Sequence, residues 1–318
     1  MSATSAAQIG APDAEIRLEP GLTATVRVPA STANLGPGFD CLGLALGVYD
    51  VVTVTVTESG ITVDASGEAA DDVPRDGSHL VARAVVRGFE FAGVGAPGLH
   101  LECANAIPHS RGLGSSAAAV VGGLGAASAL MATDGRRAAL TDAELVQLAS
   151  EFEGHPDNAA ASVLGGAVVT WMDGEGGYFA RHLDLHDDVV ATAFVPQTES
   201  STHVTRGLLP ESVTMTDAVF NLSRTALVVV ALTADPGCLF EATQDRLHQG
   251  YRAPALPETT ALIAQLRALG HAATVSGAGP SVVVLGTDSL GDAEAALAAE
   301  HGFAMTQLPI GEGVAHHA

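Results

Sequence analysis

Residues 105–123 read Asn-Ala-Ile-Pro-His-Ser-Arg-Gly-Leu-Gly-Ser-Ser-Ala-Ala-Ala-Val-Val-Gly-Gly. A strand-like run (99–104) precedes this stretch, and its small residues after the glycines are typical of a helix. Gly112 and Gly114 can adopt positive φ or let a ligand approach the backbone, and Ser115 or Ser116 is a natural N-cap. Because free N–H groups at a helix N-terminus bind anions, the stretch predicts a phosphate-binding loop.

Other interpretations of this stretch stay open on the residues alone. A strand-to-helix turn with small residues for close packing explains the glycines equally well. A Gly-x-x-x-x-Gly-Lys-Ser/Thr phosphate loop is excluded, because the chain contains no lysine. Residues 114–118 (Gly-Ser-Ser-Ala-Ala) have alanine where a nucleophile elbow has its second glycine, so a serine hydrolase using Ser116 is the weaker alternative.

The composition limits the classes of function. The 318 residues are 47% hydrophobic and only 4% aromatic, so the core is built from Ala, Val and Leu. The formal net charge of −22 argues against nucleic acids and anionic membranes as partners. All 14 basic residues are arginine, which excludes a lysine Schiff base and suits bidentate recognition of carboxylate or phosphate.

Cysteine usage and terminal sequence predict a cytoplasmic protein. Cys41, Cys103 and Cys238 are widely separated and form no Cys-x-x-Cys pair, so neither zinc nor a disulfide framework is indicated. The N-terminus has neither the early positive charge nor the apolar segment of a secretion signal. Uncharged apolar runs such as 226–231 are short, so we expect no membrane span.

The first part of the chain contains a candidate binding loop. Residues 1–20 are small, polar and aperiodic, and we expect them to form a loose arm. A strand is predicted at 23–28, and the alternation at 51–57 predicts another. Between them, residues 29–43 have too many turn residues for a strand, and Asn34 and Asp40 stand in an otherwise apolar frame. A structural turn that bonds its own backbone is the alternative.

Polar residues are also concentrated at 153–158, which read Glu-Gly-His-Pro-Asp-Asn. The capping box Thr141-Asp-Ala-Glu144 begins a helix that Gly154 ends, and Pro156 can begin the next helix. A capping role explains Asp157 or Asn158. It explains Glu153 and His155 less well, so this segment is a second candidate site.

From residue 186 onward, strands and helices alternate again. A polar segment at 196–210 contains Thr202 and Arg206, and a second polar segment at 244–252 ends at Arg252. Helices are predicted at 79–92, 217–234, 258–269 and 288–300, strands at 166–172, 178–183, 189–195, 272–275, 282–285 and 303–308, and a disordered tail that includes His316. The pattern predicts an α+β protein of two domains, 1–185 and 186–318.

Taken together, four segments resemble the GHMP family of small-molecule kinases. Residues 108–118 (Pro-His-Ser-Arg-Gly-Leu-Gly-Ser-Ser-Ala-Ala) are similar to that family's phosphate loop. Residues 28–40, 153–158 with the glycine pair 165–166, and 276–281 (Ser-Gly-Ala-Gly-Pro-Ser) resemble the members that phosphorylate homoserine. The polar segments around Arg206 and at 245–252 also fit, so the resemblance extends over roughly residues 23–310.

The resemblance implies a fold, cofactors and site residues. The fold would be α+β, with an N-terminal ATP-binding domain similar to ribosomal protein S5 and a ferredoxin-like C-terminal domain that completes the substrate site. Homodimers are common in the family. Magnesium would be held by Ser116 and Glu153, with Glu151 as the fallback. ATP would contact Ile107, Pro108, His109, Ser110, Arg111, Gly112, Leu113, Gly114, Ser115, Ser116 and Ala117. The amino acid would contact Asn34, Asp40, His155, Asn158, Thr202, Arg206 and Arg252.

The implied reaction is transfer of a phosphoryl group from ATP to the side-chain hydroxyl of L-homoserine, a step of threonine biosynthesis. Asp40 suits the ammonium group, and Arg206 and Arg252 suit the carboxylate, although either arginine could instead form a surface ion pair. An aspartate base paired with lysine is unavailable without lysine. We therefore expect Asn158 and His155 to orient the hydroxyl, with Asp157 as a candidate base. A kinase for an isoprenoid or sugar alcohol and a non-catalytic ATP sensor are the alternatives.

Overall fold

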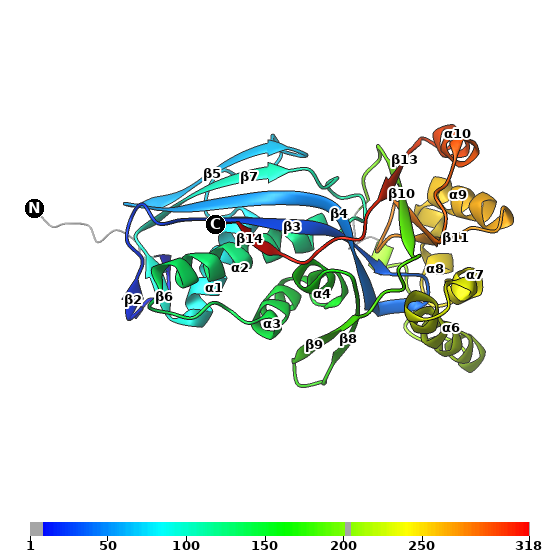
Figure 1. Cartoon of the computed structure of the whole chain (residues 1–318), viewed down its shortest axis with the longest axis horizontal. Coiled ribbons are helices and arrows are strands. Elements are labelled where there is room, and N and C mark those ends of the chain that lie inside the picture. The colour runs from blue at the N-terminus through cyan, green and yellow to red at the C-terminus, as the bar shows by residue number, and fades with distance from the viewer. Residues whose placement is uncertain (1–8, 201–204, 318) are drawn as a thin grey trace, which may run out of the picture.

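The computed structural model describes residues 9–200 and 205–317. Two α+β parts lie side by side along the long axis of the molecule, as Figure 1 shows. The N-terminal part packs helices under one face of a long sheet, and the C-terminal part packs helices against a smaller antiparallel sheet. The predicted two-part α+β architecture is confirmed. The boundary between residues 185 and 186 stays a prediction.

The N-terminal part is built on a sheet with the strand order β14-β3-β4-β7-β5, to which the β8–β9 hairpin is added through β4. Its strands are β3 (Thr23–Asn34), β4 (Gly38–Thr57), β5 (Gly60–Gly67), β7 (Gly98–Asn105), β8 (Ala167–Met172), β9 (Tyr178–Leu183) and β14 (Ala315–His317). Its helices are α1 (Leu80–Ala92), α2 (Ser115–Asp134), α3 (Asp142–Glu153) and α4 (Asp157–Leu164).

Small residues explain how α2 reaches the centre of this part. Val52, Val54 and Val56 of β4 point into the core, as the alternation predicts. A side chain at Gly122 would meet Val52 and Val28 of the sheet, and one at Gly123 would meet the backbone of α1. Glycine and alanine therefore let α2 lie between the sheet and α1, and α2 brings its N-terminus to the end of β7.

The C-terminal part has an antiparallel sheet with the order β11-β12-β10-β13. Its strands are β10 (Val190–Pro196), β11 (Ala272–Val275), β12 (Val282–Gly286) and β13 (Phe303–Leu308). Its helices are α6 (Met215–Thr233), α7 (Leu239–Ala242), α8 (Gln249–Arg252), α9 (Pro257–Ala268) and α10 (Asp292–Glu300), with short 3₁₀ turns η1 (Pro236–Cys238) and η2 (Ala253–Ala255). A second apolar core, including Phe194, Leu262 and Phe303, joins α9 and α10 to this sheet.

Three local expectations were wrong. The loose arm predicted for residues 1–20 does not hold from Ile9 onward, because β1 (Ile9–Gly10) and β2 (Ile16–Arg17) pair with β6 (Val94–Ala96). Residues 29–34 extend β3 and pair with β4, so only 35–37 form a turn. The tail predicted to be disordered returns to the first sheet, where β14 pairs with β3. In each case backbone pairing with another strand overrides the local composition.

The expectation that no segment approaches a membrane span also needs correction. By length and composition α2 and α6 could each cross a membrane, but 78% of the apolar window of α2 is buried inside the protein. Such a buried helix is an ordinary core helix. Only 22% of the corresponding window of α6 is buried.

Candidate functional site

A cavity of about 790 Å³ lies where loops of both parts meet. Its walls come from the 105–117 loop, the end of α3, the start of α4, the adjoining ends of β3 and β4, and residues 277–279 of the C-terminal part. Of the residues predicted outside the phosphate loop, it is lined by Asn34, Asp40, Glu153, His155, Asp157, Asn158, Arg206 and Arg252. Thr202 lies outside the described residues.

The predicted phosphate loop leads directly from β7 into α2. Gly112 and Gly114 have φ values of 78° and 69°, the left-handed region that favours glycine. Side chains at these positions would meet the backbone at Ser276 and Gly279 and the hydroxyl of Ser31, respectively. The N-cap of α2 is Gly114 rather than Ser115 or Ser116, which are the first two helical residues. Their N–H groups and hydroxyls lie at the edge of the cavity.

Parts of the phosphate loop face away from the cavity. Ile107, His109, Ser110, Gly112 and residues 114–117 line it, whereas Pro108, Arg111 and Leu113 do not. Arg111 donates hydrogen bonds to the carbonyl oxygens of His109, Pro196 and Gln197 at 2.8–2.9 Å. Its guanidinium group thus ties the loop to the end of β10.

Ser116 and Glu153 meet beside this loop. The Ser116 hydroxyl donates a hydrogen bond of 2.6 Å to Glu153 Oε1. This contact joins the first turn of α2 to the last residue of α3, where Gly154 ends the helix with a left-handed φ. Glu151 lies elsewhere, within 3.0 Å of Arg87, and does not line the cavity. The pair combines a hydroxyl with a carboxylate, which are ligand types that magnesium accepts.

The 153–158 segment places three further polar groups at the cavity. Asp157 Oδ1 lies 2.8 Å from His155 Nδ1 and accepts a 2.7 Å hydrogen bond from the backbone N–H of Asn158. Burial alone would lower the pKa of His155, but the hydrogen bond to Asp157 and the charges of Asp157, Asp40 and Glu153 raise the pKa overall. The amide oxygen of Asn158 accepts a 3.0 Å hydrogen bond from the Ser31 hydroxyl, which fixes its orientation.

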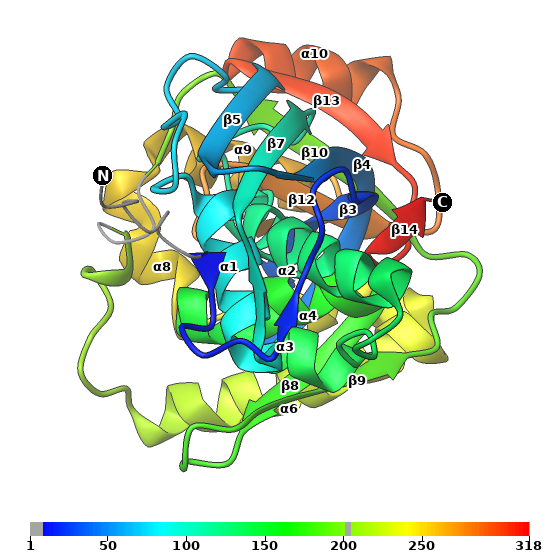
Figure 2. The same cartoon turned by 90° about the vertical axis from the view of Figure 1, so that its left-hand side faces the viewer.

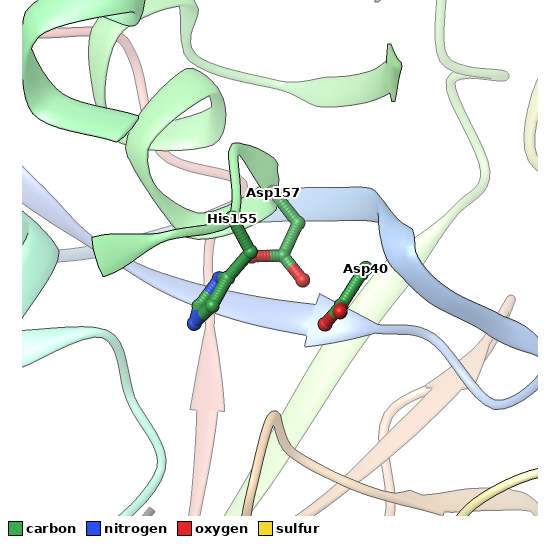
Figure 3. A group of neighbouring side chains, drawn as sticks. All are labelled: Asp40, His155 and Asp157. Atoms are coloured by element: carbon green, nitrogen blue, oxygen red, sulfur yellow. The ribbon is translucent and has the colours of Figure 1, made fainter. Parts of the chain in front are cut away.

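Asp40, His155 and Asp157 converge from two different segments, as Figure 3 shows. Their ligand atoms lie within 4.8 Å of one another, so the group could hold a cation. Asp40 already has a cationic partner, because Arg206 donates to its two carboxylate oxygens at 2.7 and 3.0 Å. This bidentate pair joins the residues that the sequence assigned to the ammonium and to the carboxylate of the amino acid.

Arg252 is 2% exposed and lies at the floor of this region. Its Nη1 donates to Gly277 O at 3.0 Å and lies 3.2 Å from His248 Nδ1, whereas the buried Nε has no hydrogen-bond partner among the described residues. Burial lowers the pKa of Arg252, and the neighbouring charge of Arg206 lowers it further. A buried guanidinium with an unused donor is prepared to bind an anion.

The sequence reasoning missed Asp50, whose carboxylate is buried against the start of the phosphate loop. Asp50 Oδ1 accepts hydrogen bonds from the backbone N–H groups of Ala106 at 2.7 Å and Ile107 at 2.9 Å. A signal was available, because Asp50 occupies a position that the alternation of β4 directs inward, beside Val52 and Val54. An acidic residue at an inward position requires buried partners.

The chain was compared with known proteins once this geometry was defined. The family model of the GHMP kinases N terminal domain matches residues 79–166, and that of the GHMP kinases C terminal matches residues 231–302. A homoserine kinase of Rhodococcus erythropolis is 58% identical over 305 residues, which are 94% of this chain and 97% of that protein. The chain belongs to the GHMP kinase family. The resemblance seen in the sequence motifs is therefore confirmed.

Two solved structures share the fold of this chain. The homoserine kinase of Cytophaga hutchinsonii matches with a TM-score of 0.82 at 23% identity, over 93% of this chain and 98% of that chain. A putative homoserine kinase of Listeria monocytogenes matches with a TM-score of 0.70 at 27% identity, over 93% and 99% of the two chains. Both similarities cover 93% of this chain and therefore include both of its parts.

Proposed function

We propose that this GHMP kinase transfers the γ-phosphoryl group of ATP to the side-chain hydroxyl of L-homoserine, giving O-phospho-L-homoserine. The observation that carries the proposal is one cavity with a phosphate loop at one end and an Asp40–Arg206–Arg252 cluster at the other. The Rhodococcus relative, a homoserine kinase, supports the same substrate. In this proposal the enzyme acts in the cytoplasm, where the phosphorylation of homoserine is a step of threonine biosynthesis.

The ATP phosphates lie on the 107–117 loop in this proposal. Without lysine, the neutralising groups are the backbone N–H groups of the loop and the N-terminus of α2, whose dipole favours negative charge. The Ser116–Glu153 pair fits magnesium better than the Asp40 cluster does, because Asp40 is already paired with Arg206, whereas Glu153 accepts a hydrogen bond from the Ser116 hydroxyl. Bound there, magnesium would neutralise charge on the phosphates.

Homoserine places its two charges on the Asp40–Arg206 pair. The ammonium group binds Asp40, and the carboxylate binds Arg206 and Arg252, which both line the cavity. Binding therefore replaces one ion pair by two, and every charge keeps a partner. Such an arrangement selects a zwitterionic amino acid over an alcohol that has only negative charge.

The reacting hydroxyl lies at Asn158 and His155, between the amino-acid cluster and the phosphate loop. Asn158 cannot accept a proton, and the Ser31 hydrogen bond sets which way its amide points. Asp157 is 1% exposed, and one of its oxygens already has two partners. We therefore assign His155 and Asn158 to orienting the hydroxyl, whose proton leaves to the phosphate or to water. Phosphoryl transfer depends more on such positioning than on covalent help.

A coupled assay of ADP release tests the substrate. Purified enzyme with magnesium and ATP is compared on homoserine, serine, threonine and mevalonate. The proposal expects the highest kcat/KM on homoserine. Preference for mevalonate would show a kinase for isoprenoid alcohols, and tight ATP binding without turnover on any alcohol would show a sensor; either result contradicts the proposal.

The two neighbouring glutamates offer a matched test of the metal site. Glu153→Gln removes the carboxylate beside Ser116, whereas Glu151→Gln removes one that pairs with Arg87 on the outer face. We expect Glu153→Gln to raise the magnesium concentration for half-maximal activity and to lower kcat, with Glu151→Gln close to wild type. A loss of activity in Glu151→Gln with near wild-type activity in Glu153→Gln would instead identify Glu151 as the magnesium ligand.

A further inference from the structure

A buried histidine, His248, lies between the turn that follows β3 and the side chain of Arg252. It stands at the start of α8 in the C-terminal part, which Figure 2 shows behind the N-terminal part. Its side chain is fully buried, and its ring stacks on Phe39 with the ring centroids 5.3 Å apart. His248 Nε2 lies 2.7 Å from Gly36 O, and His248 Nδ1 lies 3.2 Å from Arg252 Nη1. The imidazole therefore joins the β3–β4 turn to Arg252.

These two partners fix the protonation state of His248. The carbonyl oxygen of Gly36 can only accept a hydrogen bond, so Nε2 carries the hydrogen and donates. A guanidinium nitrogen can only donate, so Nδ1 is the unprotonated nitrogen and accepts from Arg252. Burial lowers the pKa of His248, although the carboxylate of Asp245, 3.7 Å from Nε2, opposes the shift. His248 is thus a neutral ring whose donor and acceptor are both engaged.

The backbone around His248 is also held in place. The carboxylate of Asp245 is fully buried, and its Oδ2 accepts hydrogen bonds from the backbone N–H groups of His248 at 3.0 Å and Gln249 at 2.8 Å. Gln249 Oε1 in turn accepts a 2.7 Å hydrogen bond from the backbone N–H of Val275, which fastens the start of α8 to β11. The imidazole is therefore a rigid support for whatever it contacts.

Arg252 depends on such a support for its orientation. Arginine has several rotatable bonds, so its guanidinium binds a carboxylate as a fork only where that group is held in one orientation. Nη1 of Arg252 has two acceptors, Gly277 O at 3.0 Å and His248 Nδ1 at 3.2 Å, and Cζ lies 5.4 Å from the centroid of the Phe39 ring. Loss of the acceptor at Nδ1 would leave the guanidinium held at Gly277 O alone and free to turn away from the cavity.

We propose that His248 is a positioning residue for the carboxylate of the amino-acid substrate. Its Nδ1 orients the guanidinium of Arg252, and its Nε2 holds Gly36, which stands four residues before Asp40. One ring thereby fixes the separation between the group that receives the carboxylate and the group that receives the ammonium. This role rests on the proposed function, because it takes the carboxylate of homoserine as the ligand of Arg252.

Two amide substitutions separate the two contacts of His248. Oδ1 of asparagine stands as many bonds from Cα as Nδ1 of histidine, so His248→Asn can accept from Arg252 but does not reach Gly36 O. Nε2 of glutamine stands as many bonds from Cα as Nε2 of histidine, so His248→Gln can donate to Gly36 O but leaves Arg252 without its acceptor. The matched control is His271→Gln, because His271 pairs with Glu294 at 3.1 Å and does not line the cavity.

Calorimetric titration with L-2-aminobutyrate tests the proposal without turnover, because this compound has both charges of homoserine but lacks its hydroxyl. We expect His248→Gln to weaken binding roughly tenfold, His248→Asn to recover most of that loss, and His271→Gln to bind as wild type does. In kinetic assays KM for homoserine should rise in His248→Gln while KM for ATP stays unchanged. 3-Aminopropan-1-ol is homoserine without its carboxylate, so its kcat/KM should be the same in His248→Gln and wild type.

A histidine that only fills space in the core would give a different pattern. Equal losses in His248→Asn and His248→Gln, a parallel rise of KM for ATP, or an equal loss on 3-aminopropan-1-ol would each overturn the positioning role. Wild-type binding of L-2-aminobutyrate that His248→Gln leaves unchanged would overturn this role alone. A wild-type protein that does not bind L-2-aminobutyrate would instead contradict the proposed substrate, and the role of His248 with it.

Discussion

Replacing Asp50 by alanine should loosen the start of the phosphate loop. The backbone N–H groups of Ala106 and Ile107 donate to Asp50 Oδ1 at 2.7 and 2.9 Å, and both lose their acceptor in Asp50→Ala. An unsatisfied buried amide costs about 1–3 kcal/mol, so the two together cost about 2–6 kcal/mol. Recovery of the buried carboxylate's desolvation free energy offsets part of that cost and leaves about 3 kcal/mol. Amide exchange in peptide 105–112 should then accelerate roughly a hundredfold.

Asp50→Asn is the matched control for this prediction. It keeps the acceptor oxygen, so we expect a change within about 1 kcal/mol. Exchange is followed by mass spectrometry, with peptides from α9 as an internal reference. In kinetic assays Asp50→Ala should raise KM for ATP roughly tenfold and leave KM for homoserine unchanged. Wild-type exchange at 105–112 in Asp50→Ala would refute the reasoning, because it would mean that the two amides have found other acceptors.

The pKa of Asp50 adds a pH test. Burial raises this pKa above its ordinary 3.8, although the N–H groups of Ile107 and Ala106 oppose the shift. An acid whose pKa is higher in the folded state contributes most to stability below its unfolded pKa and loses that contribution as pH rises through the folded value. The stability of Asp50→Asn relative to wild type should therefore increase from pH 3 upward, and a constant difference would contradict the assignment.

Three further substitutions follow from the site geometry. Ser116→Ala should lower kcat and raise the magnesium concentration for half-maximal activity, and near-normal turnover would contradict the metal assignment. Gly114→Ala should cost more stability than Gly93→Ala in thermal unfolding, because both glycines have similar positive φ but only Gly114 faces Ser31. Asp157→Asn should keep measurable turnover; complete loss at unchanged substrate affinity would make Asp157 the base.

Local signals in the sequence located most helices and strands. The capping box at Thr141 is formed with both of its hydrogen bonds, and α3 ends at Gly154 with the left-handed φ expected of a C-cap. These features depend on residues three or four apart, so the sequence displays them directly. The segment 29–34 was missed for the opposite reason. Its strand exists because of pairing with residues 38–49, which outweighs its own turn-forming residues.

In the candidate site, too, features that depend on nearby residues were predicted, and features that depend on distant residues were missed. Motif residues such as Ser116 and Glu153 were identified from their segments, and the structure brings them within 2.6 Å. Asp50 was missed because its partners lie more than 50 positions away in the sequence. The Asp40–Arg206 pair was unexpected for a similar reason, since 166 positions separate the two residues. The spacing of residues in a motif can identify a charged residue as a candidate for the site. Only the folded structure shows which oppositely charged residue lies next to it.

In the binding mode proposed above, the Asp40–Arg206 pair decides which substrate charges this lysine-free chain accepts. Without an amino acid, each member neutralises the other at 2.7 Å. A zwitterion that enters supplies a cation to Asp40 and an anion to Arg206, so no charge is left alone. A purely anionic alcohol such as mevalonate can only take the arginine, which leaves Asp40 unpaired at a cost of about 1–2 kcal/mol, roughly tenfold in affinity. Asp40→Asn removes that cost, and it should therefore weaken homoserine binding while narrowing the difference between homoserine and mevalonate. An unchanged ratio of the two affinities in Asp40→Asn would show that selection resides elsewhere in the cavity.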